Sequence, residues 1–193
     1  NCAGTLPDAI RSIQAQTYEN WELVLCDDGS TDNTYKIAEA FKREDSRIRL
    51  LRNEHNLGLN ETLNRCLREA KGGYIARQDG DDMSLPERFV LQVALLESRP
   101  DIALVSGIMV LFDEQGDWGK TSPVPEPTTT DLLPTGAFAH AASMMRKEAL
   151  EQVGGYSVSP GLLRVEDYHL WYKLYKAGYQ GVNLQVPLYR GRD

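Results

Sequence analysis

The stretch Gln78-Asp79-Gly80-Asp81-Asp82 places three carboxylates close together in the chain. It follows the apolar run 74–76, which predicts a buried strand, and it precedes Ser84-Leu85-Pro86-Glu87, which predicts a helix start with Ser84 as its cap. Carboxylates on one tight turn raise each other's pKa, and a shared cation removes that cost. Carboxylate oxygens suit magnesium or manganese, which also take phosphate oxygens as ligands. The stretch therefore predicts a metal–phosphate site at a strand end.

Two simpler interpretations compete with this metal site. A solvated turn without any ligand fits the same five residues. A calcium-binding loop requires glycine at its sixth position, and counting from Asp79 that position holds Ser84. The calcium loop is therefore excluded, whereas the solvated turn stays open until the surrounding elements are considered.

Length and composition predict one soluble globular domain. The 193 residues include 21 basic and 28 acidic side chains, giving a net charge of −7, and no apolar run approaches the length of a membrane span. This charge argues against a nucleic-acid partner, because a phosphate backbone requires a basic face. The three cysteines are odd in number and lack metal-ligand spacing, which indicates a reducing compartment. We therefore expect a cytoplasmic location, with peripheral attachment at the inner face of the membrane as an alternative.

Predicted strands and helices alternate through about the first 110 residues. Helices are expected at 6–13, 35–41, 60–70 and 86–98, and strands at 21–26, 48–51, 74–76 and 102–112. This alternation favours an α/β fold with a mostly parallel sheet and helices on both faces.

The regular alternation of predicted strands and helices ends after this part. Residues 116–134 carry four prolines and predict a long loop or a hairpin. Beyond them, strands are expected at 141–145 and 181–186, and helices at 147–153 and 166–177.

Two acidic turns follow two different predicted strands. Asp27-Asp28 ends the strand at 21–26, and the turn at 79–82 ends the strand at 74–76. In an open parallel sheet, ligands bind outside the carboxyl ends of the strands, so both turns lie on one edge. This favours a nucleotide site over a solvated turn. The chain has no G-x-G-x-x-G after a strand and no G-x-x-x-x-G-K-S/T, which argues against a Rossmann dehydrogenase and a P-loop enzyme.

Three segments, in order along the chain, resemble the family 2 glycosyltransferases. Residues 20–34 are similar to the opening motif of that family, and residues 74–82 to its D-x-D motif. Gly154-Gly155-Tyr156 and residues 166–171 are similar to its acceptor-side segment. The resemblance implies the GT-A fold of nucleotide-diphospho-sugar transferases, which is Rossmann-like. It also implies a single domain over 1–193, with a nucleotide-binding half at 1–112 and an acceptor-side half at 113–193.

The chain departs from the family pattern at two places. Family members usually open with an apolar strand that ends in Pro-x-Tyr-Asn, and here only Asn1 corresponds to it. The resemblance therefore implies a fragment whose first strand, normally inside the sheet, is missing. The second departure is Gly80, which stands where the family more often has alanine or serine.

The resemblance assigns the donor side of the site to five residues. It implies that Asp28, with Asp27 beside it, contacts the nucleobase, and that Asp79 contacts the ribose hydroxyls or the diphosphate region. Arg77 would offset the diphosphate charge. Asp81, together with Asp79, would bind the divalent metal, Mn²⁺ or Mg²⁺. A turn-stabilising role for Asp27 and a surface role for Arg77 stay open as alternatives.

On the acceptor side, the resemblance points to Asp167 as the general base and to Glu166 as a residue that orients the site or binds acceptor. Asp167 lies at the start of a predicted helix, where the helix dipole favours the carboxylate anion. His140, after the long loop, receives no role.

The resemblance implies an inverting, metal-dependent, hexosyltransferase-type enzyme. Its donor would be a nucleotide-diphosphate sugar, a UDP-sugar first, and its acceptor a sugar or a lipid-linked molecule, in bacterial cell-surface polysaccharide or glycoconjugate synthesis. Two other classes stay open: a nucleotide-binding module without catalysis, and a nucleotidyltransferase, which shares this sheet architecture. The pair Glu166-Asp167 favours the first class, and the chain lacks the glycine-rich basic phosphate loop expected of a nucleotidyltransferase.

Overall fold

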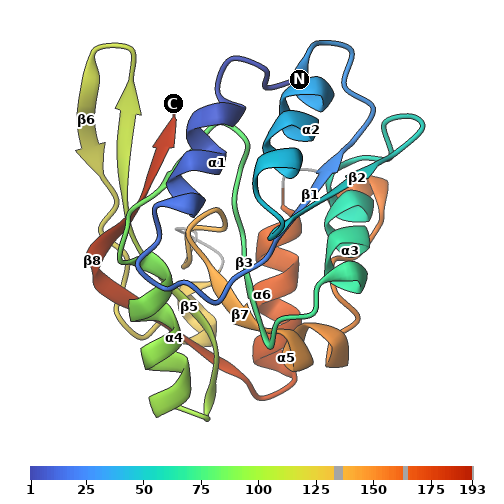
Figure 1. Cartoon of the computed structure of the whole chain (residues 1–193). Coiled ribbons are helices and arrows are strands. Elements are labelled where there is room, and N and C mark those ends of the chain that lie inside the picture. Colours follow the sequence, from blue (N-terminus) through green and yellow to red (C-terminus); the bar gives the residue numbers. More distant parts are fainter. Residues whose placement is uncertain (133–136, 163–164, 193) are drawn as a thin grey trace.

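The computed structural model describes residues 1–132, 137–162 and 165–192. Its first part contains the predicted alternation of helices and strands (Figure 1). The elements are α1 (Leu6–Gln14), β1 (Leu23–Asp27), α2 (Thr34–Glu44), β2 (Ile48–Arg52), α3 (Leu59–Glu69), β3 (Tyr74–Ala76), β4 (Met83–Ser84), α4 (Arg88–Ser98) and β5 (Ile102–Asp113). The expected helix at 86–98 begins later, at Arg88, because Ser84 belongs to β4 and pairs with Tyr189. The prediction of Ser84 as a helix cap is therefore wrong.

The second part is built around the long strand β8. Its elements are β6 (Gly116–Lys120), a 3₁₀ turn η1 (Thr129–Asp131), β7 (Met144–Arg146), α5 (Lys147–Gln152), a 3₁₀ turn η2 (Pro160–Leu162), α6 (Glu166–Lys176) and β8 (Gln180–Arg192). β6 forms a hairpin with β5, so the start of the proline-rich segment is a hairpin, and residues 133–136 lie outside the described residues. β8 extends well beyond the expected 181–186 because it pairs along nearly the whole of β5.

The sheet is mixed, whereas the sequence predicts a mostly parallel one. Its strand order is β3-β7-β5-β8-β4, with β6 added to β5, and β1 and β2 form a separate parallel pair. Among the described strands, β5–β8 is the other parallel pairing, and the remaining pairs are antiparallel. The β5–β6 pair is antiparallel because a short hairpin joins its strands, a connection that parallel strands cannot have.

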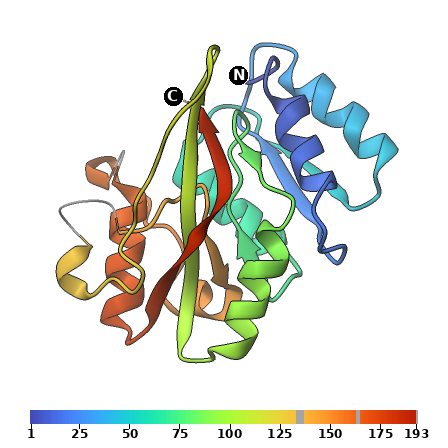
Figure 2. The same ribbon diagram turned by 90° about the vertical axis from the view of Figure 1, so that its left-hand side faces the viewer.

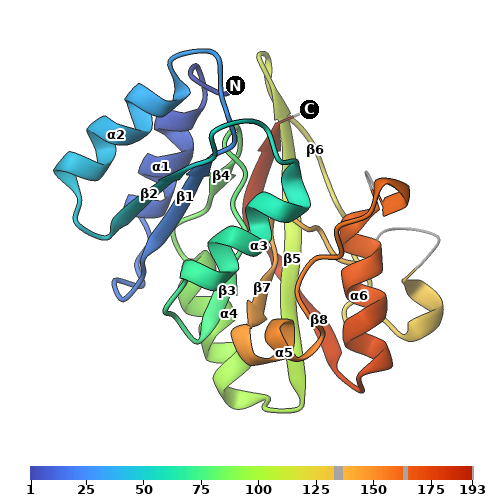
Figure 3. The same ribbon diagram turned by 90° about the vertical axis from the view of Figure 1, so that its right-hand side faces the viewer.

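Helices cover both faces of the six-stranded sheet, as expected (Figures 2 and 3). On one face, Ile13 of α1 and Phe89 and Leu96 of α4 pack with Val105 and Met144. On the other face, α3, α5 and α6 pack together around the fully buried Trp171. A third cluster joins α1 and α2 to the β1–β2 pair. No helix among the described residues is long and apolar enough to cross a membrane.

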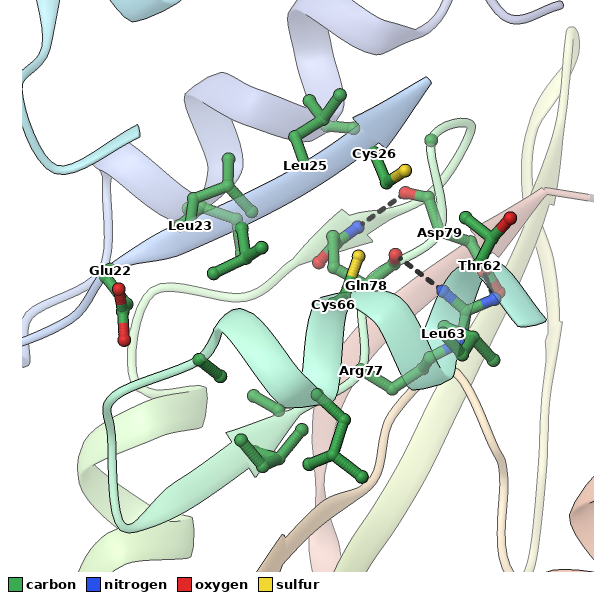
Figure 4. A pocket seen from close by; sticks show the side chains of 18 of the residues that line it. Glu22, Leu23, Leu25, Cys26, Thr62, Leu63, Cys66, Arg77, Gln78 and Asp79 are labelled. Atoms are coloured by element: carbon green, nitrogen blue, oxygen red, sulfur yellow. Dashed lines mark hydrogen bonds and ion pairs between the residues drawn. The ribbon is translucent and has the colours of Figure 1, made fainter. Parts of the chain in front are cut away.

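A cavity of about 1010 Å³ separates β1 from β3. Within the described chain, β1 pairs only with β2 and β3 only with β7, so the two strands turn unpaired edges toward the cavity. Leu23 and Leu25 of β1 lie on one side of it, and Leu63 and Cys66 of α3 lie below (Figure 4). Because neighbouring strands lie about 4.8 Å apart, such a space between two strand edges suits one further strand.

Candidate active site

The acidic turn after β3 presents its three carboxylates differently. Asp79 is partly buried, and its backbone N–H donates to the Tyr189 hydroxyl over 3.0 Å. Asp82 is buried, and its Oδ1 accepts the Arg192 N–H at 2.7 Å, which ties the turn to the end of β8. Asp81 is exposed to solvent. Of the three, Asp81 is therefore the carboxylate most accessible to a ligand.

Charges and burial shift the pKa values in this turn. Burial raises the pKa of Asp79, an effect that the ion pair with Arg77 opposes and the charge of Asp81 reinforces. Burial raises the pKa of Asp82 to about 6, against the hydrogen bond from Arg192. The turn therefore carries unfavourable negative charge, which a bound cation would relieve.

The donor atoms of this turn fit a divalent cation that is shared with a phosphate. Among the described residues, Asp81 makes no hydrogen bond or ion pair, and no three His, Cys, Asp or Glu side chains form a ready metal cluster. Magnesium usually binds one or two carboxylates and completes its shell with waters and phosphate oxygens. Asp81 and one oxygen of Asp79 meet that requirement.

The other predicted acidic pair, Asp27-Asp28, lies at the end of β1. Asp28 Oδ1 accepts hydrogen bonds from Asn53 Nδ2 (2.7 Å) and the Leu57 N–H (2.8 Å), and Oδ2 accepts the Gly58 N–H (3.0 Å). Although burial alone would raise it, these bonds hold the pKa of Asp28 below its ordinary value. Asp28 therefore shapes the loop ahead of α3, a role that the sequence did not suggest.

Asp27 is more buried than its neighbour. It is 2% exposed, and neither carboxylate oxygen has a hydrogen-bond partner among the described residues. Arg52, its neighbour across the β1–β2 pair, approaches Oδ2 at 3.4 Å. A buried carboxylate without hydrogen bonds is costly, so Asp27 is a candidate for contact with a further group in the cavity that it lines.

Glu166 and Asp167 form the first turn of α6 and lie near the acidic turn. The charge of Glu166 contributes to raising the pKa of Asp79, which reports their proximity. Asp167 Oδ1 accepts the Tyr168 N–H at 2.8 Å. Burial nevertheless raises the pKa of Asp167, and the charge of Glu166 adds to that effect. Burial therefore outweighs the effect that the helix N-terminus has on the pKa of Asp167, and its role as general base stays a prediction.

His140 belongs to a buried cluster with Tyr156 and Trp171. Its Nε2 lies 2.8 Å from the Tyr156 hydroxyl, and its ring meets Trp171 edge-on at 5.9 Å. Burial and the charge of Arg77 lower the pKa of His140 to about 3, so the imidazole is neutral at physiological pH. His140 is therefore a neutral, buried partner of Tyr156 that packs against α6.

The N-terminal residues also support the acidic turn, which the sequence did not reveal. Thr5 Oγ1 donates to the Gly80 carbonyl at 2.9 Å. A Cβ at Gly80 would lie 2.9 Å from Cys2 Sγ, closer than atoms of these types pack. Glycine at position 80 thus leaves room for the Cys2 side chain. The unusual glycine in this turn was the one sequence feature that could have indicated this contact.

Solved structures define the class of this fold. The structure of Staphylococcus aureus TarS 1–349 in complex with UDP is similar with a TM-score of 0.78 at 20% identity, covering 100% of this chain and 58% of that one. The mannosyltransferase PcManGT from Pyrobaculum calidifontis, in complex with GDP-Man and Mn²⁺, is similar with a TM-score of 0.74 at 20% identity, covering 96% of this chain and 52% of that one. The fold is that of the GT-A glycosyltransferases.

Sequence comparison then identifies the family. The model of glycosyl transferase family 2 matches residues 1–154, and the chain belongs to this family of transferases. EpsE of Bacillus subtilis, a candidate glycosyltransferase by its name, is 44% identical over 197 residues, covering 100% of this chain and 70% of EpsE. The UDP-Glc:alpha-D-GlcNAc-diphosphoundecaprenol beta-1,3-glucosyltransferase WfgD of Escherichia coli is 30% identical over 177 residues, covering 91% of this chain and 66% of WfgD. The chain thus spans about two thirds of these relatives.

Proposed function

We propose that this domain transfers a sugar, with inversion, from a nucleotide-diphosphate donor to an acceptor hydroxyl in a metal-dependent reaction. The observation that carries the proposal is the proximity of two carboxylate groups from distant parts of the chain. The exposed Asp81 lies on the turn after β3, and Glu166 and Asp167 open α6. His140 lies between these two segments in the packing, because it contacts Trp171 of α6 and its neighbour Ser143 accepts the Arg77 N–H next to the turn. One group suits the donor diphosphate, and the other suits an acceptor hydroxyl.

The donor side uses residues of the half 1–112. Asp28 Oδ2 accepts one hydrogen bond within the chain, so it keeps capacity for a nucleobase N–H, and uracil offers such a donor. Asp27 lies beside it, and Asp79 would contact the ribose or the diphosphate. Asp81 and Asp79 would hold Mn²⁺ or Mg²⁺, which supplies positive charge at the departing diphosphate.

The acceptor side uses residues of the half 113–193. Asp167 accepts the proton of the acceptor hydroxyl while that oxygen bonds to the anomeric carbon. The bond from this carbon to the diphosphate oxygen breaks on the opposite face, so the configuration inverts and the nucleoside diphosphate leaves with the bonding electrons. Arg77 offsets part of its charge. Because burial raises the pKa of Asp167, its carboxylate is a stronger base than an exposed aspartate.

The name of WfgD supports a lipid-linked sugar as the acceptor class, and TarS with bound UDP supports a UDP-sugar as the donor. We therefore place the protein in cell-surface polysaccharide or glycoconjugate assembly, in the cytoplasm or at the inner face of the membrane.

The test is donor hydrolysis and transfer by the intact protein. The protein is incubated with a panel of UDP- and GDP-sugars and released nucleotide is measured, with Mn²⁺, with Mg²⁺ and with a chelator. The proposal expects turnover of one donor that depends on the metal. Tight donor binding with no turnover in the presence of lipid-linked acceptors would instead favour a binding module.

A further inference from the structure

The guanidinium of Arg88 is fully buried behind the acidic turn. Arg88 has 0% exposure and forms no ion pair with any described carboxylate. Its hydrogen bonds go to neutral oxygens: Gln92 Oε1 (3.1 Å), Ser84 Oγ (2.8 Å), Arg77 O (2.8 Å) and Ser143 O (2.9 Å). Burial of a cation without a carboxylate is costly, so this position calls for an explanation beyond packing.

Arg88 is linked to the acidic turn by a short chain of hydrogen bonds. Ser84 Oγ accepts from Arg88 Nη1 and donates to Gln78 Oε1 at 2.7 Å. Gln78 Nε2 then donates to two carbonyl oxygens, that of Asp79 at 2.9 Å and that of Asp82 at 3.0 Å. A single side-chain amide thus ties together the two ends of the turn that carries the carboxylates (Figure 4 shows Gln78 beside Asp79).

We propose that Gln78, oriented by Arg88 through Ser84, is the positioning residue that holds the acidic turn in its metal-binding shape before any metal arrives. This inference rests on the proposed metal-dependent function. The turn needs such support because its like charges repel and, without a cation, favour opening of the loop. If the turn is already formed, metal binding loses less free energy to ordering the loop.

The positive charge of Arg88 stabilises the acidic turn, as its hydrogen bonds do. Burial lowers the pKa of Arg88 to about 10, so the guanidinium stays protonated at neutral pH. The protonated side chain is joined through Ser84 and Gln78 to the turn that carries the three carboxylates. The buried cation Arg88 therefore supports the turn from inside the protein, whereas Asp81 faces solvent on the other side.

The experiment replaces Gln78 by methionine in the intact protein. Methionine has nearly the same shape but no amide donors, and Gln115→Met, at an exposed position in the β5–β6 turn, is the matched control. The first measurement is hydrogen exchange of the 79–82 amides in metal-free protein. The second is calorimetric binding of UDP with Mn²⁺ and with Ca²⁺. Ser84→Ala removes the hydroxyl that links Arg88 to Gln78, and both measurements are repeated on it. Ser98→Ala on α4 is its control.

Gln78→Met is expected to speed exchange at 79–82 about 10-fold, because the side-chain hydrogen bonds that hold the turn are lost. UDP binding with Mn²⁺ should weaken about 10-fold, while binding with Ca²⁺, which tolerates looser geometry, changes less. A lower melting temperature with unchanged exchange at the turn and an unchanged Mn²⁺-to-Ca²⁺ ratio would overturn the inference. Failure of the wild-type protein to bind UDP with Mn²⁺ would instead overturn the proposed function, while the exchange result still reports on the turn.

Discussion

Asn64 of α3 and Tyr156 exchange two hydrogen bonds across 92 residues of sequence. Asn64 Oδ1 accepts the Tyr156 N–H at 2.8 Å, and Asn64 Nδ2 donates to the Tyr156 carbonyl at 2.7 Å. A Cβ at the preceding Gly155, whose φ is +59°, would lie 2.5 Å from Asn64 Oδ1. This one side chain therefore joins α3 to a segment 92 residues further along the chain.

Loss of this link should destabilise the fold. Asn64→Ala leaves the Tyr156 N–H and carbonyl without partners, and we expect it to lower the free energy of unfolding by about 2 kcal/mol. Asn20→Ala, at an exposed position, is the control and should change it by less than about 0.5 kcal/mol. Urea unfolding measures both, and equal midpoints for the two variants would contradict the prediction.

Asp81→Ala should abolish metal-dependent nucleotide binding without harming the fold. Asp81 is exposed and makes no described hydrogen bond, so its removal costs no internal contact. We expect calorimetry with UDP and Mn²⁺ to show no binding, and the melting temperature without metal to stay at the wild-type value. Asp8→Ala removes an exposed carboxylate on α1 and serves as the control. Unchanged UDP affinity in Mn²⁺ for Asp81→Ala would place the metal elsewhere.

Asp167→Asn should separate chemistry from binding. Asparagine keeps the shape but cannot accept the proton, so we expect transfer to fall about 100-fold or more while donor affinity stays near wild type. Because burial raises the pKa of Asp167, wild-type transfer should decline on acidification at a higher pH than an ordinary aspartate gives. A pH–rate profile and a donor titration measure both effects. If Asp167→Asn retains most of its turnover, Glu166 becomes the next candidate for the base.

Asp82→Asn should change how stability depends on pH. The folded protein holds the pKa of Asp82 at about 6, above its ordinary value of 3.8, so between these values the folded state binds more protons than the unfolded state. The stability contribution of this group therefore rises as pH falls from 7 through 6 toward 4. Asparagine can still accept the Arg192 N–H, so the variant should be more stable than wild type at pH 7.5, by at most about 3 kcal/mol. Thermal unfolding at pH 7.5 and pH 4.5 checks this, and a less stable variant at pH 7.5 would refute it.

The cavity between β1 and β3 should accept an added strand. A longer chain with an apolar strand directly ahead of Asn1 buries side chains between α1 and α3 and pairs two free strand edges. We expect its free energy of unfolding to exceed that of residues 1–193 by about 3 kcal/mol or more. A control extension of equal length with polar residues and proline should give no gain. Equal urea midpoints for both extensions would show that the cavity does not receive a strand.

Local pattern was sufficient for most elements of this fold. Apolar residues at helical spacing in α1, with a proline in the first turn, and the short apolar runs of β1 and β3 are visible without any tertiary contact. Ser84 shows the limit of such signals. A serine shortly before a proline is compatible with a helix cap as well as with a strand. Ser84 belongs to a strand because it pairs with Tyr189 of the distant β8.

The sequence by itself determined that two acidic turns follow strands and that Glu166-Asp167 opens a late helix, because each feature is written in neighbouring residues. Only the tertiary structure decided what each carboxylate does. Asp28 is held by the loop at 53–58, Asp82 by Arg192, and Asp81 is left to solvent. Burial shifts the pKa of Asp167 and of Asp79 upward, and burial depends on the packing of the whole fold, which no local pattern records. Asp79, for example, contacts Tyr189, which is 110 residues away in the chain.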